Sequence, residues 1–302
     1  MAMSRYRANS GVLGLPAPSE IWAPIASLAR RSCERRRGCN GWYTSDVNVT
    51  WSVVDAQSAI SSKVGCGPTT INADTAGSTV SCVATSDGGT TTESVTVKID
   101  KTKPTVAVTG VTAGGQYVMG AVPAAGCQTL DAMSGLATAA TVVVTTTGTN
   151  GVGAFTASCS GAVDVAGNAQ AALVQATYTV VYGFGGFISP LPRSTLTRSG
   201  STIPTKFRLT NASGQPIASS LAAAMAAAGN VKATLSGPGI TAVSAVCTWS
   251  ATDLFFQCNL KTPGGIVSGP AYQITAYERF GTAFVVVPAV GSAVNPEIVF
   301  FK

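Results

Sequence analysis

The sequence predicts an all-β protein: a row of small β-sandwich modules, with one short helix in the last of them. Apolar and polar residues alternate with a period of two, for example over residues 47–53 and 79–85. Turn signals such as Asp87-Gly88-Gly89 separate these segments about every ten residues. Short alternating strands at this spacing are typical of β-sandwiches.

The composition is that of a folded chain with an almost neutral body. Charged residues make up 11% of the 302 residues and hydrophobic residues 46%, which excludes intrinsic disorder for most of the chain. The net charge of +6 is concentrated in residues 1–39, which hold seven arginines and two glutamates. Because nucleic-acid binding needs a basic face on the folded module, we expect no nucleic-acid partner.

Changes of pattern divide the chain into an arm and three modules. Residues 1–39 show no sustained period and are interpreted as a disordered or foreign N-terminal arm. The modules are predicted at residues 40–103, 104–182 and 183–302. The first ends in the polar break Lys101-Thr102-Lys103-Pro104.

Two local signals fall at the second boundary and inside the third module. Glycine and proline punctuate residues 182–192, which we interpret as the second linker. The helix is predicted near residues 219–228, with Ser219 or Ser220 as its N-cap and Gly229 after its end.

No membrane span is expected. Residues 132–163 carry no charge, but threonine, glycine and serine interrupt them throughout. A spanning helix needs about 20 predominantly apolar residues.

The eight cysteines favour disulfides. They stand singly in the sequence, and the chain has no histidine, so a zinc site is disfavoured and an oxidising compartment is favoured. Each predicted module holds one pair, and the candidate bridges are Cys66–Cys82, Cys127–Cys159 and Cys247–Cys258. Cys33 and Cys39 remain in the arm. The pairing is a hypothesis, since eight cysteines allow roughly a hundred arrangements.

The sequence carries no catalytic motif. The absence of histidine excludes Ser-His-Asp and Cys-His catalysis. The carboxylates are scattered, and an acid–base mechanism would need two of them close together with a raised pKa. We therefore expect no enzyme activity.

Two sets of residues are candidate binding sites. Asp164 and Asn168 could offer oxygens to Ca²⁺, although Asx turns explain the same residues, so no cofactor is expected and Ca²⁺ is the alternative. Aromatic residues of the third module could form a sugar-stacking platform, or they could be core residues. These ligand-contact candidates are Trp249, Phe255, Phe256, Tyr272 and Tyr277.

Residues 41–47, followed by Trp51-Ser52-Val53, resemble the opening of a bacterial extracellular immunoglobulin-like repeat of the HYR kind. Residues 55–60 and 131–136 resemble its Asp-x-x-Ser-Gly-Ile turn, although Ala59 replaces the glycine in the first. Residues 164–168 are similar to its Asp-x-Ala-Gly-Asn turn.

The third module resembles the domain named after its Pro-x-Lys-Phe (PxKF) motif. The motif stands at residues 204–207, the aromatic segment at residues 182–190 matches, and so does the ending Val299-Phe300-Phe301-Lys302. Together the resemblances cover residues 40–302. They imply tandem immunoglobulin-like β-sandwich modules of a secreted or cell-surface bacterial protein, and no agreed activity.

The expected function follows from these points. We expect a non-catalytic structural spacer or stalk, as a fragment of a longer repeat protein. The alternative is an adhesion or carbohydrate-binding module accessory to an extracellular enzyme. The expected partner of either is a cell-wall or extracellular glycan or a protein.

Overall fold

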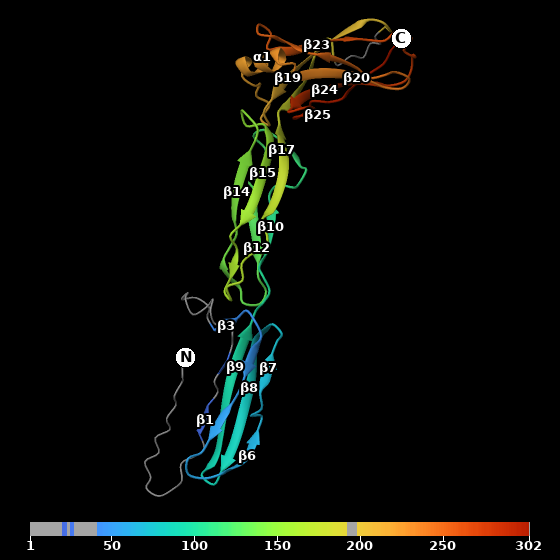
Figure 1. The fold of residues 1–302 in the computed structure, drawn as a ribbon. Coiled ribbons are helices and arrows are strands. Elements are labelled where there is room, and N and C mark those ends of the chain that lie inside the picture. The colour runs from blue at the N-terminus through green and yellow to red at the C-terminus, as the bar shows by residue number, and fades with distance from the viewer. Residues whose placement is uncertain (1–19, 23–24, 27–40, 192–197, 302) are drawn as a thin grey trace. The chain divides into compact units, whose positions relative to one another are not determined.

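The computed structural model is almost entirely β-structure, with one helix in the part it describes (Figure 1). It describes residues 20–22, 25–26, 41–191 and 198–301. The chain packs into two units. Unit 1 comprises Met1–Thr109, Gly126–Val142 and Ser158–Val174, and unit 2 comprises Gly110–Ala125, Val143–Ala157 and Gln175–Lys302.

Three sheets form the first part of unit 1. Their strand orders are β3-β9-β8-β6, β2-β4-β7 and β1-β5. The strands are β1 (Glu20–Trp22), β2 (Ile25–Ala26), β3 (Trp42–Tyr43), β4 (Val47–Val49), β5 (Ser52–Val54), β6 (Ile60–Val64), β7 (Thr69–Ile71), β8 (Thr75–Ser86) and β9 (Gly89–Ile99). Alternation in β4 and β9 sends Val47, Val49, Val97 and Ile99 into a fully buried core.

Part of the predicted arm belongs to this fold. Glu20–Trp22 pairs with β5, and Ile25–Ala26 pairs with β4. The interpretation of residues 1–39 as a disordered or foreign arm is therefore wrong for these five residues. Backbone pairing with strands that otherwise have a free edge outweighs the missing periodicity. The rest of the arm, with Cys33 and Cys39, lies outside the described residues.

Three further sheets follow along the chain, with strand orders β10-β12, β11-β17-β15-β14 and β13-β16. The strands are β10 (Thr105–Thr109), β11 (Gln116–Val118), β12 (Gly126–Leu130), β13 (Leu136–Thr138), β14 (Thr141–Thr146), β15 (Gly153–Ser160), β16 (Val163–Asp164) and β17 (Val174–Val181). The boundary between the two units crosses β14, β15 and β17. In unit 2 the buried Tyr178 stacks on Phe155 and meets Tyr117 edge-on, with ring centroids 5.6 Å apart in both pairs.

The last two sheets lie in unit 2 and have the strand orders β18-β19-β23-β22 and β21-β20-β24-β25, with β26 also on β24. The strands are β18 (Gly183–Ile188), β19 (Thr202–Thr210), β20 (Val231–Ser236), β21 (Val243–Val246), β22 (Thr248–Ser250), β23 (Phe255–Lys261), β24 (Tyr272–Phe280), β25 (Ala283–Val286) and β26 (Glu297–Val299). Phe184, Phe207 and Phe256 are fully buried and pack ring against ring. Every sheet of the described chain takes its strands from one predicted module, with the arm added to the first.

The segment interpreted as the second linker is a strand. Residues Gly183–Ile188 form β18, which pairs with β19 through a register shift between Phe184 and Phe187. The glycines that suggested a loop allow close packing instead. A Cβ on Gly183 would lie 2.3 Å from a methyl group of Val290. Only Tyr182 separates β17 from β18, and it is buried.

The helix α1 spans Ser219–Ala227, close to the prediction, but its cap differs. Ala218 is the N-cap and makes no side-chain hydrogen bond to the helix. The predicted cap Ser219 instead accepts a hydrogen bond from the indole N–H of Trp249, at 3.2 Å. Gly229 follows the helix with φ +68°, a conformation that favours glycine.

Each predicted module contains one disulfide. The structure joins Cys66 to Cys82, Cys127 to Cys159 and Cys247 to Cys258. Each bridge contributes roughly 2–4 kcal/mol by restricting the unfolded chain. This matters because small sandwiches bury limited cores.

Glu278 on β24 is a fully buried carboxyl in unit 2. Its Oε1 accepts the backbone N–H of Tyr182 at 2.8 Å, and its Oε2 has no hydrogen-bond partner among the described residues. Burial raises the pKa of Glu278 to about 8, although the Tyr182 N–H opposes this rise. Burial of Tyr182 and the nearby Glu278 charge together raise the pKa of Tyr182 to about 12.

The buried Glu278 predicts a pH-dependent stability. The folded state keeps its proton up to about pH 8, whereas the unfolded state releases it near pH 4.5. The free energy of unfolding should therefore fall as pH rises between these values, by roughly 1 kcal/mol per pH unit at most. Denaturant titrations of the wild type and Glu278→Gln at several pH values measure this, because the variant should lose the slope.

The matched control is Glu93→Gln, which changes an exposed carboxyl on β9. It should keep the wild-type slope. An equal slope in the wild type and Glu278→Gln would contradict the assignment.

Candidate functional site

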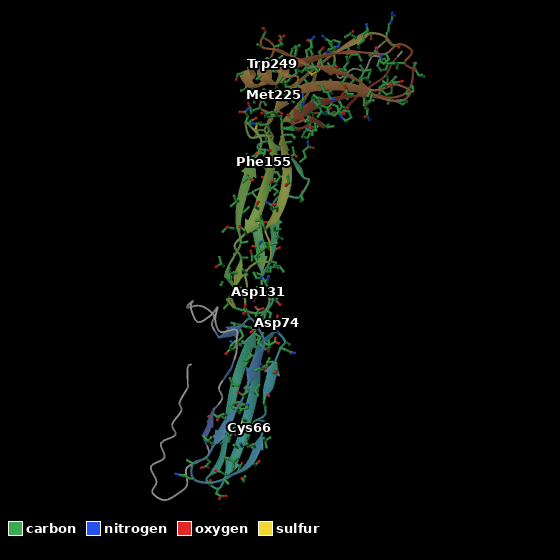
Figure 2. The ribbon with its side chains drawn as sticks, viewed as in Figure 1. Cys66, Asp74, Asp131, Phe155, Met225 and Trp249 are labelled. Atoms are coloured by element: carbon green, nitrogen blue, oxygen red, sulfur yellow. A yellow bond between two sulfur atoms is a disulfide. The ribbon has the colours of Figure 1, made fainter. Side chains whose placement is uncertain are left out.

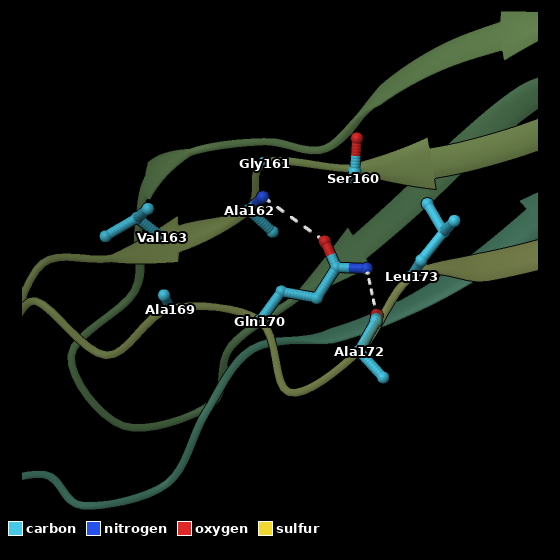
Figure 3. Close-up of a pocket in the computed structure, with 8 residues that line it drawn as sticks. All are labelled: Ser160, Gly161, Ala162, Val163, Ala169, Gln170, Ala172 and Leu173. Carbon is cyan, nitrogen blue, oxygen red and sulfur yellow. Dashed lines mark hydrogen bonds between the residues drawn. The ribbon is translucent and has the colours of Figure 1, made fainter.

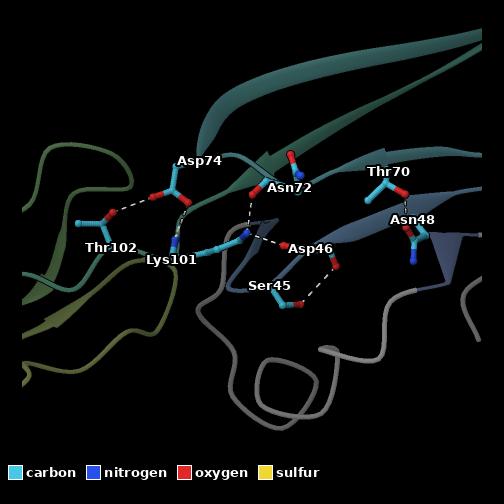
Figure 4. Close-up of polar contacts among 8 residues, drawn as sticks. All are labelled: Ser45, Asp46, Asn48, Thr70, Asn72, Asp74, Lys101 and Thr102. Carbon is cyan, nitrogen blue, oxygen red and sulfur yellow. Dashed lines mark hydrogen bonds and ion pairs between the residues drawn. The ribbon is translucent and has the colours of Figure 1, made fainter.

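Two carboxylates of the first module, those of Asp74 and Asp46, bind the predicted break after β9 (Figure 4). Asp74 accepts the backbone N–H of Lys101 at 3.0 Å and the hydroxyl of Thr102 at 2.7 Å. The ammonium of Lys101 forms an ion pair with Asp46 and donates to the backbone carbonyl of Asn72. The linker is therefore held through the backbone N–H of Lys101 and through the side chains of Lys101 and Thr102.

Residues of the second module hold the same linker from the other side. The Asn168 amide donates to the carbonyls of Asp100 and Thr102, at 2.9 and 3.2 Å. The Ser134 N–H donates to the Asp100 carboxylate at 3.0 Å, and so does the Thr102 N–H. We call Asp74, Asp100 and Asn168, with the linker groups they bind, the linker clamp. All of it lies in unit 1.

An Asx turn at Asp131 lies beside this region, because the Ser134 N–H is shared between Asp100 and Asp131. The Asp131 carboxylate accepts the N–H groups of Met133, Ser134 and Gly135 at 2.8–3.2 Å. The first module repeats this turn at Asp55, which accepts the N–H groups of Gln57 and Ser58. A hydrogen bond from the Ser86 side chain, with these N–H groups, lowers the pKa of Asp55 to about 2.

The two turns differ in their neighbours. Asp55 has the Ser86 hydroxyl beside it. Asp131 instead lies near the carboxylates of Asp100 and Asp164, and one oxygen from each of the three lies within 4.8 Å of the others. Asp100 and Asp164 are fully buried and Asp131 is half-buried. Figure 2 labels Asp74 and Asp131, which mark the first-module and second-module sides of this region.

These three carboxylates are the described residues that could hold a metal ion. Hard oxygen donors and a net negative charge suit Ca²⁺, and the partial exposure of Asp131 leaves room for water ligands. The expectation from sequence named Asp164 and Asn168. Asp164 belongs to the group, but the Asn168 amide nitrogen donates to Asp164 Oδ2 at 2.8 Å and to the linker carbonyls. Asn168 therefore acts as a hydrogen-bond donor in the clamp.

The predicted aromatic ligand contacts are mostly core residues. Phe255, Phe256 and Tyr272 are buried, so the prediction of ligand contact is wrong for these three. Phe256 stacks on Phe207 and Tyr272 meets Phe301 edge-on. Phe255 faces the other side of β23, where the ammonium of Lys206 lies 4.9 Å from its ring. Trp249 is half-buried against Phe256 and α1, where Figure 2 labels it beside Met225.

Tyr277 is also half-buried, and the ammonium of Lys232 lies 5.3 Å from its ring. Trp249 and Tyr277 stay candidates for ligand contact.

A shallow hollow of about 220 Å³ lies at one end of β15 (Figure 3). Small side chains line it together with Gln170 and Leu173. The Gln170 amide is already bound to backbone groups, since it donates to the Cys159 carbonyl at 3.0 Å and accepts from the Ala162 N–H at 3.4 Å. The hollow therefore offers a ligand few polar groups.

The sequence prediction missed Asp74 and Asp100. No motif in the sequence analysis includes either residue. The available signal was the pair of aspartates that flank the long β8–β9 hairpin. The ends of one antiparallel hairpin lie together, which brings Asp74 to the residues that follow β9.

Comparison with family models and with curated protein sequences found no match. Comparison with solved structures found matches of low score, three of which are described next. FdeC, an Escherichia coli adhesin, is 13% identical, with 94% of this chain and 96% of that chain covered and a TM-score of 0.28. A tetra-tandem repeat in the extending region of a large adhesion protein is 12% identical, with coverages of 94% and 74% and a TM-score of 0.29. Sidekick-1 immunoglobulin domains 1–5 are 11% identical, with coverages of 92% and 59% and a TM-score of 0.32.

The chain is an all-β protein built from several small sheets that follow one another along the sequence. Scores this low leave its function to be argued from its own residues. The resemblances to HYR-like and PxKF families stay predictions. In the described part of the chain, no helix is long and apolar enough to cross a membrane.

The linker clamp predicts resistance to trypsin at Lys101. Removing Asp74 with Asp74→Ala takes away two hydrogen bonds to a charged acceptor, which should raise the rate of cleavage after Lys101 about tenfold or more. Mass spectrometry of a trypsin time course follows the fragment that ends at Lys101. Lys103 is no competing site, since Pro104 follows it.

Asn48→Ala is the control, because it removes an exposed hydrogen bond from the Thr70 hydroxyl outside the clamp. It should leave the rate unchanged. Equal rates in the wild type and Asp74→Ala would show that the clamp does not order the linker.

Proposed function

We propose that the chain is a non-catalytic spacer or stalk of a secreted or cell-surface protein. The observation that carries the proposal is the linker clamp, in which both flanking modules bind the backbone of the four-residue break after β9. A spacer must keep its length under thermal motion, and hydrogen-bonded linkers limit that motion. A flexible tether would instead be rich in glycine and serine and free of such bonds.

Three further features support the proposal. The second boundary has no loop, since β17 continues into β18 through the buried Tyr182, whose N–H is held by Glu278. Each module carries a disulfide, which suits an oxidising, extracellular setting. The chain has no histidine for general acid–base chemistry.

The alternative is an adhesion or carbohydrate-binding module. It rests on exposed aromatic side chains, and three of its five candidate residues are core residues. Trp249 and Tyr277 remain, but each is half-buried and already engaged by Ser219 or Lys232. The residues therefore favour the spacer.

Distance measurements across the linker test the spacer. Spin labels on exposed positions Lys63 of β6 and Thr138 of β13 report on the two sides of the clamp within unit 1. Labels attached through non-natural amino acids leave the disulfides intact. We expect one narrow distance distribution in the wild type, and a broader one when Asp74→Ala and Asn168→Ala are combined.

The same label pair in Asn48→Ala should give the wild-type distribution. A broad distribution in the wild type would contradict the spacer and favour a flexible tether.

We further propose that Ca²⁺ binds Asp100, Asp131 and Asp164. A bound cation would offset the repulsion among three close carboxylates, two of them buried, and so stiffen the same joint. Asn168 would stay a donor to the linker. The calcium proposal can fail while the spacer stands, because the clamp does not need the ion.

Calcium binding predicts a metal-dependent melting temperature. Ca²⁺ at roughly 100 times its dissociation constant should raise the melting temperature of the chelator-treated chain by about 5 °C. Asp131→Asn keeps an oxygen for the turn but removes a charge, so it should lose this increase.

Asp55→Asn makes the same change in the matching turn of the first module, where no carboxylate of the group lies, and should keep the increase. No increase in the wild type, or equal loss in both variants, would refute the site.

A further inference from the structure

The strand β14 is an edge strand with nothing to protect it. It ends the sheet order β11-β17-β15-β14 (Figure 1). All six of its residues, Thr141–Thr146, are exposed. Exposed strand edges pair readily with other chains, and proteins usually block them with charges, proline, bulges or short length. β14 contains neither a charge nor a proline, and residues 132–163 carry no charge.

Four other edge strands are protected. β6 carries Lys63 and a register shift after Ile60. β18, equally long, contains three glycines and a register shift. β11 and β22 have only three residues each. The edge strand β10 also lacks charge and proline, but its valines Val106 and Val108 are half-buried, whereas every residue of β14 is exposed.

The side chains of β14 are also costly to leave in water. Val142, Val143 and Val144 are 37, 56 and 46% exposed, and they form the one run of three consecutive exposed large hydrophobic residues in the described chain. Every residue of the strand is valine or threonine, the β-branched types that fit a paired strand. In the folded chain β14 pairs with β15 along one edge, and its other edge has no partner strand in this sheet.

The sequence of the strand fits a two-fold axis. Thr141-Val142-Val143-Val144-Thr145 reads the same in both directions. In an antiparallel pair of two copies centred on Val143, threonine would face threonine and valine would face valine. Such self-complementary pairing is what a two-fold symmetric contact requires.

The chain already uses this side-chain pairing on an exposed surface. Across β8 and β9 the hydroxyl of Thr79 meets that of Thr96 at 3.0 Å, and Ser81 meets Ser94 at 2.8 Å. Opposed β-branched residues and hydroxyl pairs both stabilise antiparallel strands. The neutral surroundings of β14 add no repulsion between two identical copies.

We propose that β14 is a self-association site, at which two copies of this chain pair their β14 strands antiparallel about Val143. The pair extends the sheet of each copy across the contact. Six residues bury less surface than a stable dimer needs, so the association is weak and reversible. Neighbouring stalks that project from one surface would gain from many such contacts together.

Sedimentation of the full chain over about 1 μM to 1 mM tests the association. We expect a reversible monomer–dimer equilibrium in the wild type. Val143→Lys places two ammonium groups opposite each other and should weaken the dimer about tenfold or more. Val64→Lys, on the edge strand β6, changes an equally exposed valine and should leave the dimer unchanged.

Cysteine crosslinking tests the register. In the proposed pair, position 143 faces its own copy, whereas position 142 faces position 144. Under mild oxidation Val143→Cys should give a covalent dimer on a non-reducing gel, above the wild-type background, and Val142→Cys should give much less. Circular dichroism confirms that each variant is folded.

Three results would overturn the proposal. A wild type that stays monomeric over the whole concentration range would exclude self-association and favour pairing of this edge with a strand from another protein. Equal loss of dimer in Val64→Lys and Val143→Lys would make the contact nonspecific. Equal crosslinking at positions 142 and 143 would exclude the two-fold register.

Discussion

A fixed linker conformation in this chain depends on hydrogen bonds to the backbone N–H and C=O groups of the linker. An N–H or C=O group that leaves a sheet and loses water must find another partner. After β9 the partners are side chains. The Asp74 carboxylate accepts a hydrogen bond from the Lys101 N–H, and the Asn168 amide donates to the carbonyls of Asp100 and Thr102. Two side chains from different modules thus replace the missing strand pairing. The spacer proposal rests on these side chains, which replace water as the hydrogen-bond partners of the linker backbone.

The same sequence motif acquires different chemistry in the two modules. Asp55 and Asp131 form matching turns, each with its carboxylate on successive backbone N–H groups. The neighbour of Asp55 is a hydroxyl, whereas Asp131 has two buried carboxylates close by. The turn is therefore local in origin, while the concentration of negative charge arises only where the linker and a second turn meet. A motif scan reports the turn and misses the charge.

Local patterns predicted much of the fold. The alternation around Val47 and Val49 and the turn at Asp87 depend on neighbours in sequence, and the structure has a core strand and a hairpin there. The three bridged cysteine pairs lie close in sequence, within 32 residues. The failures involve partners that are far apart. Ser219 binds Trp249 instead of capping the helix, and Gly183 packs against Val290 instead of opening a loop. Glu20–Trp22 pairs with a strand 30 residues away, and no periodicity announces so short a segment.

Hydrogen exchange at the linker tests the central claim most directly. Nuclear magnetic resonance can follow the N–H groups of Lys101, Thr102 and Ser134, which are bound to the carboxylates of Asp74 and Asp100. We expect these groups to exchange far more slowly than those of an unstructured chain, at a rate approaching that of the Val97 N–H inside β9. Exchange at the unstructured rate would show that the linker is open in solution, and the clamp could not then hold the modules as a spacer.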